Sequence, residues 1–499
     1  MITHYLKIAL RNIFKDRIYR IFLIILVVAT ACGNSRRPGL SDKDLFAQRK
    51  VETVQEPEEQ APDFSDMETY VVTHGIKYKE SRAVDPAHPP VVINIANRNL
   101  NIRKFNMSDY YSKIRYVKLK HPKSETEGNI IFDFDVHYSI SMNKNLQRMS
   151  GIITVPQFNF TDDYIIAGDL GSGLYCYDME GKFLFTIESN DIPKNQYRNY
   201  NYYDGTALKG FYGKITVNEN KCFYNLVENN ENMICFYDLA QEKRIMTKPF
   251  NGRIHGTALI LDHQSMADYV YEPVKAAKHF LLTFDLKGDT LCRFPNYNQI
   301  PVITGGSYNS PPSSDIYYHN KQLTIRQVFN DTVYRVVSPN RLIPAYVLNF
   351  GAYRADIPTF FRGDLSEKLL PYTWKEAEQY ILFVYKQNQD SPNNRQNGSV
   401  KFFYSYYDRK NRQFYHFSEG TSVPFDQYFM DNSIPDALPF VWSYADIEDN
   451  QLRVVYTKKR LEEISKSKEF ASLSPEQQNK LKTMQNELDD SEVLIMILE

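Results

Sequence analysis

The chain has 499 residues, with 59 Lys and Arg against 60 Asp and Glu and a formal net charge of −1. A nearly neutral chain lacks the basic surface that holds a nucleic acid, so we expect no nucleic-acid partner. Aromatic residues stand out, with 37 Tyr and 31 Phe against 2 Trp. Because Tyr and Phe favour the half-buried surface of a sheet, this composition predicts β-structure.

The N-terminus carries the pattern of a secretion signal. Basic residues outnumber acids over residues 1–20, and the following run, Ile21–Ala31, has no charge. Since a membrane span needs roughly 20 apolar residues, this shorter run predicts a signal peptide over residues 1–31. The small residues before Cys32 resemble a lipoprotein cleavage site, so we expect Cys32 to be lipidated and to anchor the protein to a membrane. The alternative is an uncleaved anchor helix that begins near Leu6.

The remaining chain divides into a tether and one domain. Residues 33–68 are rich in Glu, Gln and Pro and poor in apolar residues, which predicts a flexible tether over residues 32–90. Beyond it, apolar and polar residues alternate with period two, as in Phe132, Phe134 and Val136. This alternation is typical of strands, so we predict an all-β domain over residues 91–499.

A strand that ends in an aromatic residue and Asp recurs along this domain. The copies end at Asp178, Asp238, Asp285 and Asp408, and a degenerate copy begins at Asp331. An Asp carboxylate suits this place because it accepts backbone N–H groups in a tight turn. A repeat of roughly 50–60 residues with about four strands is the signature of a propeller blade. We predict six blades, with seven as the alternative, from strands near residues 132–142, 158–187, 215–247, 254–294, 315–348, 380–417 and 438–456, of which the first and last stretches share one blade.

The chain ends in a predicted helix and strand. Ser474-Pro-Glu-Gln477 is a capping box with Pro at the first helical position, and the apolar run Val493–Leu498 fits a strand covered on both faces. The first and last blades of a propeller must be joined, because otherwise both have open edges. We therefore expect Val493–Leu498 and Tyr116–Leu119 to close the ring.

Several segments resemble the six-bladed β-propeller lipoproteins of Bacteroidota. They are Asn330–Arg335, Ile343–Tyr353, Arg115–Leu119 and the closing helix and strand near Glu487–Leu498, within a resemblance that covers about residues 100–499. The resemblance implies an envelope lipoprotein without an established activity. It also implies kinship with the NHL-type propellers, which mostly bind other molecules.

Candidate ligand-binding residues are aromatic and basic. Tyr197, Arg198, Tyr200, Tyr202 and Tyr203 lie in one predicted loop between blades, and Trp374 lies in another. Such side chains offer flat faces and polar groups to sugars, peptides or protein surfaces. The alternative is that these loops fold onto their own scaffold.

Three further sets of residues concern metal binding, glycosylation and the cysteines. Asp133, Asp135 and His137 share one face of a predicted strand and form a candidate Ca²⁺ or Zn²⁺ site, with a solvated strand face as the alternative; no other cofactor is expected. Thr290 and Thr332 resemble O-glycosylation sites, with buried hydroxyls as the alternative. Four cysteines, Cys176, Cys222, Cys235 and Cys292, are predicted to be buried free thiols, with a Cys222–Cys235 disulfide as the alternative.

The sequence contains no HExxH, GxSxG or GxxxxGK[ST] signature. We therefore expect a non-enzymatic binding or scaffold module whose partner is an envelope protein, a peptide or a glycan. The alternative is a propeller-type hydrolase or lyase. Gly33 stands where Asp retains lipoproteins in the inner membrane of other bacteria, so we predict the periplasmic face of the outer membrane.

Overall fold

The computed structural model describes residues 70–73, 76–79, 82, 84–96, 101–122, 135–140, 149–154, 157–169, 173–189, 210–218, 220–228, 231–249, 258–262, 264–269, 279–285, 289–298, 315–327, 329–362, 365, 367–388, 398–424, 427–430, 433–434, 436–448 and 450–499. All of them belong to one compact unit, Phe64–Glu499. The predicted signal peptide and Cys32 lie outside the described residues. No helix in the described parts of the chain is long and apolar enough to cross a membrane.

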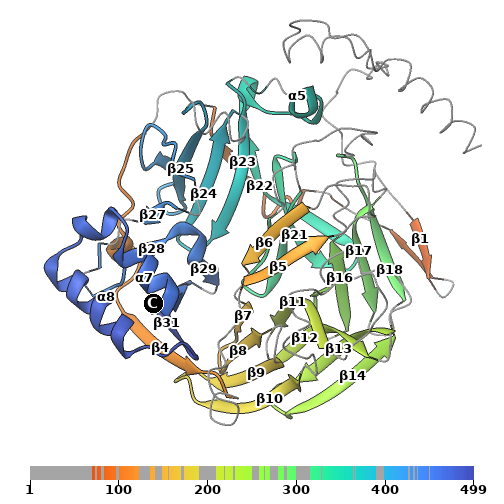
Figure 1. Ribbon diagram of the computed structural model, residues 1–499. Coiled ribbons are helices and arrows are strands. Elements are labelled where there is room, and N and C mark those ends of the chain that lie inside the picture. The colour runs from red at the N-terminus through yellow and green to blue at the C-terminus, as the bar shows by residue number, and fades with distance from the viewer. Residues whose placement is uncertain are drawn as a thin grey trace, which may run out of the picture. The chain divides into compact units, whose positions relative to one another are not determined.

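Six sheets follow one another along the chain as the blades of a β-propeller, which confirms the predicted blade number (Figure 1). The first five blades contain β7–β10 (Gln157–Phe160, Tyr164–Asp169, Gly173–Asp178, Phe183–Ser189), β11–β14 (Gly210–Asn218, Lys221–Glu228, Glu231–Asp238, Lys243–Pro249), β15–β18 (Ala258–Ile260, Ser265–Tyr269, His279–Asp285, Thr290–Pro295), β19–β22 (Asp315–His319, Gln322–Arg326, Thr332–Ser338, Arg341–Asn349) and β23–β26 (Leu369–Glu376, Tyr380–Gln387, Lys401–Asp408, Gln413–His416). The first strands of neighbouring blades contact each other: β7 contacts β11, and β19 contacts β23. The first strands therefore lie on the inside of the ring, and the fourth strands lie on its rim.

The sixth blade joins the two ends of the domain, as predicted. Its strands are β29 (Ala445–Glu448), β30 (Gln451–Thr457), β31 (Glu492–Leu498) and β4 (Ile114–Lys120), in that order. All seven residues of β31 are buried. Val493, Ile495 and Ile497 pack in a core with residues of the first blade, whereas Leu494, Met496 and Leu498 pack in a core with residues of the fifth. The uninterrupted apolar run is thus explained by a strand that both neighbouring blades cover.

The strand predicted near residues 132–142 has a different partner from the one expected. β5 (Asp135–Ile140) pairs with β6 (Met149–Thr154) in a separate two-stranded sheet. The last blade takes β4 as its outer strand instead, so the prediction that residues 132–142 share this blade was wrong. Period-two alternation identifies a strand, but it does not identify the partner of that strand.

The predicted turns and helix start are confirmed. The first carboxylate oxygen of Asp178, Asp238, Asp285 and Asp408 accepts a backbone N–H from the turn after the third strand of its blade, at 2.8 to 3.1 Å. Helix α8 (Pro475–Glu487) begins with the capping box between Ser474 and Gln477.

Further short elements lie outside the strands of the six blades. They are the helices α5 (Ile357–Arg362) and α7 (Lys458–Ser465), the 3-10 helices η1 (Met107–Asp109), η3 (Gly351–Tyr353), η4 (Trp442–Tyr444) and η5 (Glu469–Ser472), and the strand pair β27 (Phe429–Met430) and β28 (Phe440–Val441).

The described residues between 70 and 120, which we name the N-terminal strap, follow the rim of the ring from the third blade to the sixth. The hairpin of β1 (Tyr70–Thr73) and β2 (Ile76–Lys79) contacts β18 (Figure 1). Next, β3 (Val91–Asn94) adds a fifth, parallel strand beside β22, and Ile102 bridges to His416 of β26. The strap ends as β4 of the sixth blade. The described strands β1 and β2 thus lie ahead of the boundary predicted at residue 91.

Candidate functional site

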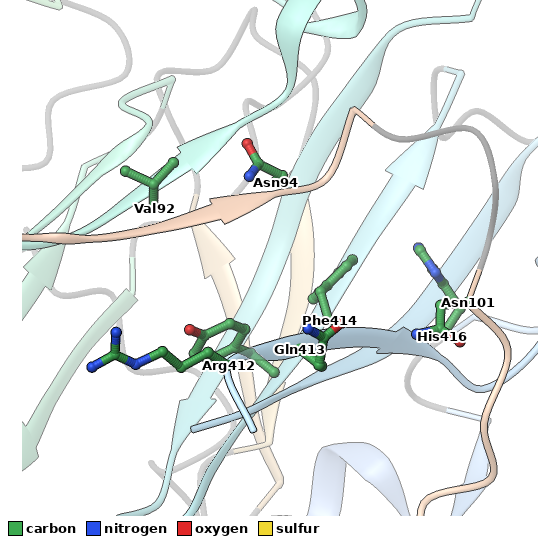
Figure 2. A pocket seen from close by; sticks show the side chains of 8 residues that line it. Val92, Asn94, Asn101, Arg412, Gln413, Phe414 and His416 are labelled. Atoms are coloured by element: carbon green, nitrogen blue, oxygen red, sulfur yellow. The ribbon is translucent and has the colours of Figure 1, made fainter. Parts of the chain in front are cut away.

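A cavity of about 280 Å³ opens between the strap and the outer strand of the fifth blade. We name it the rim cavity. Figure 2 shows Val92 and Asn94 of β3 on one side of it, and Arg412 with β26 on the other. Its lining consists of Val92, Asn94, Asn101, Tyr407, Arg412, Gln413, Phe414 and His416.

The pairing of β3 determines which of its side chains reach the cavity. Since side chains alternate along a strand, Ile93 turns into the core, where it is 2% exposed, while Val92 and Asn94 face the cavity. The carbonyl oxygen of the Asn94 side chain accepts a hydrogen bond of 2.9 Å from Nδ2 of Asn349 on β22. This bond orients the Asn94 amide and leaves its NH₂ group to donate elsewhere.

The strap holds His416 from both sides along the backbone. The amide of His416 donates to the carbonyl of Asn101 at 2.9 Å, and the amide of Arg103 donates to the carbonyl of His416 at 2.9 Å. Asn101 and His416 therefore lie next to each other at one end of the rim cavity (Figure 2).

The imidazole of His416 is buried and incompletely hydrogen-bonded. It is 3% exposed, and its Nε2 lies 2.6 Å from the hydroxyl of Tyr385. Its Nδ1 is buried and has no hydrogen-bond partner in the part of the chain that the structure describes. Burial lowers the pKa of His416 to about 4, so the ring is neutral at physiological pH. An unsatisfied buried polar atom costs about 1–3 kcal/mol, and a ligand atom that bonds to it would recover part of that free energy.

The rim cavity is polar and carries positive charge. Arg412 is the one charged side chain among its eight described lining residues, and none of the eight is a carboxylate. Arg412 has a φ of 52°, which places it in the tight turn that leads into β26. Arg412 is exposed, and its guanidinium can donate hydrogen bonds in a planar fork. The lining also contains three side-chain amides and the rings of Tyr407 and Phe414. This set of groups suits binding better than acid–base chemistry.

A second buried polar group joins the fourth and fifth blades. The carboxylate of Glu376 on β23 accepts hydrogen bonds from Nη2 of Arg335 at 2.5 Å, from the hydroxyl of Tyr346 at 2.5 Å and from the hydroxyl of Tyr317 at 2.7 Å. Arg409 and His319 approach the same carboxylate at 3.4 Å. We name these six residues the Glu376 cluster.

The electrostatics of the Glu376 cluster indicate a structural role. Burial alone would raise the pKa of Glu376, but the charges of Arg335 and His319 outweigh it and hold that pKa below its usual value. Both carboxylate oxygens are already bonded, so the cluster joins two blades and does not await a ligand. Because it unites side chains of β19, β21, β22, β23 and the turn after β25, no local sequence pattern indicated it.

Trp374 is placed differently from the prediction. It belongs to strand β23 and not to a loop, and it is 3% exposed between Tyr346 and Phe383. The strand continues past Pro371, which has no N–H to donate, with a register shift between Pro371 and Thr373. Buried between two blades, Trp374 offers no flat face to a ligand, which agrees with the alternative that it packs onto its own scaffold.

Most of the other predicted site residues lie outside the part of the chain that the structure describes. Tyr197, Arg198, Tyr200, Tyr202, Tyr203 and Asp133 lie outside the described residues, as do the side chains of Asp135 and His137 in β5. Within the described part, no three His, Cys, Asp or Glu side chains are grouped to hold a metal ion.

The predicted glycosylation sites and the cysteines lie within the described residues. Thr290 is the first residue of β18 and Thr332 is the first residue of β21, and both are half-buried. The four cysteines are buried free thiols, which confirms that prediction and excludes the Cys222–Cys235 disulfide from this structure.

Comparisons with known proteins address the fold and the family. A crystal structure of a protein from Bacteroides fragilis NCTC 9343 that is thought to be exported aligns with 82% of this chain and 98% of its own, at 12% identity and a TM-score of 0.46. BamB from Moraxella catarrhalis aligns with 45% of this chain and 54% of its own, at 8% identity and a TM-score of 0.25. No curated protein matches the sequence. The model of the family described as "Domain of unknown function (DUF4933)" matches residues 73–467, and this chain therefore belongs to that family.

Proposed function

We propose that this chain is a non-enzymatic binding module of the cell envelope, with the rim cavity as its ligand site. The observation that carries the proposal is the partnerless Nδ1 of His416, buried in the wall of a polar cavity. Buried polar atoms are nearly always bonded, so an orphan in a cavity wall is a reason to expect a ligand there.

The way in which the cavity is built supports a binding role. Its two walls come from segments distant in sequence, and both are fixed by backbone pairing: β3 along β22, and residues 101–103 along β26. A site held by paired strands is preorganised, so little free energy is lost in ordering it when a ligand binds.

The envelope location rests on the N-terminal sequence. A basic segment, an uncharged run and small residues before Cys32 support export, cleavage and lipidation. We place the lipidated protein at the periplasmic face of the outer membrane. Metabolic labelling with a tagged fatty acid tests the anchor, because Cys32→Ala should abolish the label. Ready digestion of the domain by protease added to intact cells would contradict the periplasmic face.

Ligand-dependent stability tests the binding role. Small polar compounds are screened for an increase in the melting temperature of the wild type and of Asn101→Trp, in which the larger ring fills the cavity. A ligand at about 100 times its Kd stabilises the folded state by about 2.7 kcal/mol. Stabilisation of the wild type but not of Asn101→Trp supports the proposal, and equal stabilisation of both contradicts it. Mass spectrometry shows whether the compound is consumed, and its consumption would favour a propeller-type hydrolase or lyase instead.

A further inference from the structure

We infer that the rim cavity recognises a sugar acid, that is, a sugar ring that bears a carboxylate. This inference rests on the proposed function and specifies its ligand. It follows from the size of the cavity, from its balance of donors and acceptors, and from the arrangement of its polar and aromatic groups.

Size limits the ligand. The volume of about 280 Å³ lies just below the range of about 300–1,000 Å³ that is typical of sites for drug-sized molecules. One sugar ring with its substituents is of this scale, whereas a folded partner could insert a single side chain at most. The cavity opens at the rim, so a ring at the end of a longer glycan could enter it as well as a free sugar.

The charge of the lining selects a carboxylate. Arg412 is the charged residue in the lining, and no acid stands beside it among the described lining residues. Guanidinium and carboxylate bind each other through two parallel N–H···O bonds, which are stronger than bonds between neutral groups. The NH₂ group of Asn94, whose amide oxygen is already bonded to Asn349, adds a further donor.

The rest of the lining suits a ring with several hydroxyl groups. The amides of Asn101 and Gln413 can donate and accept at once, as a hydroxyl group requires of its partners. His416 lies at the end of the cavity opposite Arg412 (Figure 2), and its buried Nδ1 has no partner among the described residues. Phe414 and Tyr407 contribute aromatic carbon, which can cover the apolar C–H face of a sugar ring.

Calorimetric titration with D-galacturonate and D-glucuronate tests the inference, with galactose and glucose as their neutral parents and acetate as a carboxylate without a sugar ring. At least one sugar acid should bind about tenfold more tightly than its neutral parent and than acetate, because only it engages Arg412 and the amides together. Arg412→Gln should abolish the preference for the acid. Lys410→Gln removes the same charge from the same turn at a residue that does not line the cavity, and it should preserve the preference.

The outcomes separate this inference from the proposed function. Equal affinity for acid and parent, or equal effects of Arg412→Gln and Lys410→Gln, would overturn the sugar-acid assignment. If no sugar acid binds but another compound stabilises the wild type and not Asn101→Trp, the assignment fails and the binding role stands. If no compound distinguishes the wild type from Asn101→Trp, both fail.

Discussion

Leu119 of β4 lies directly opposite Val493 of β31, so the outer strand of the last blade comes from the N-terminal part of the domain. β31 is paired on its other side with β30, where Val493 lies opposite Thr457. The C-terminal strand is therefore an interior strand of its sheet, and the ring depends on it.

Deleting residues 491–499 should consequently unfold or aggregate the domain. The six apolar side chains of Val493–Leu498 are buried, and burial of each contributes about 1.5–3 kcal/mol. Even after a discount for the denatured state, their sum is comparable to the 5–15 kcal/mol by which a typical domain is stable. Circular dichroism during heating measures this. A truncated protein that melts within a degree or two of the full chain would contradict the closure.

Glu376→Gln should strongly destabilise the protein. The amide keeps the shape of the side chain but leaves Arg335 buried without its counter-charge. Removing one partner of a buried ion pair typically costs about 3–5 kcal/mol. The free energy of unfolding in denaturant provides the measurement. Glu378→Gln is the matched control, because Glu378 is exposed, and it should change stability by less than about 1 kcal/mol. Similar losses in both variants would refute the role of the Glu376 cluster.

His416 should make stability depend on pH between about 6.5 and 4. Its folded pKa of about 4 lies below the value of about 6.5 in the unfolded chain, so the unfolded chain takes up the proton first as pH falls. Acidification from pH 6.5 to 4 should therefore lower the free energy of unfolding by up to about 3 kcal/mol through this group. Above pH 6.5 this group should not change the free energy of unfolding. His416→Gln should lose correspondingly less stability over the same range. Parallel pH profiles for wild type and His416→Gln would rule the effect out.

Features that depend on neighbouring residues could be predicted from the sequence. The turn bonds of Asp178 and the helix cap of Ser474 act within four residues, and the apolar run Val493–Leu498 has a pattern of its own. The rim cavity could not be predicted in this way. Asn94 lines the same cavity as His416 because β3 pairs with β22, where Val91 lies opposite Tyr346. Such a long-range parallel pairing has no local signature.

Arg82→Ala should loosen the strap without opening the ring. Arg82 donates to the carbonyl of Pro295 at 2.7 Å, and its guanidinium lies 4.7 Å from the ring centre of Tyr297. Loss of about 2 kcal/mol from these contacts should speed amide exchange in β1 and β2 by roughly 30-fold. Exchange in β4 should not change, because its bonds to β31 remain. Equal acceleration in β4 would show that ring closure depends on the contact with the third blade.

Nitrogen NMR of His416 tests the central claim most directly. In protein labelled with ¹⁵N at its 10 histidines, the His416→Gln variant identifies the two ring signals of His416. We expect saturating D-galacturonate to shift the Nδ1 signal, because Nδ1 gains its missing partner, and to change Nε2 less, because Nε2 stays bonded to Tyr385. Signals of His416 that do not change while the ligand binds elsewhere would contradict the assignment of the rim cavity as the binding site.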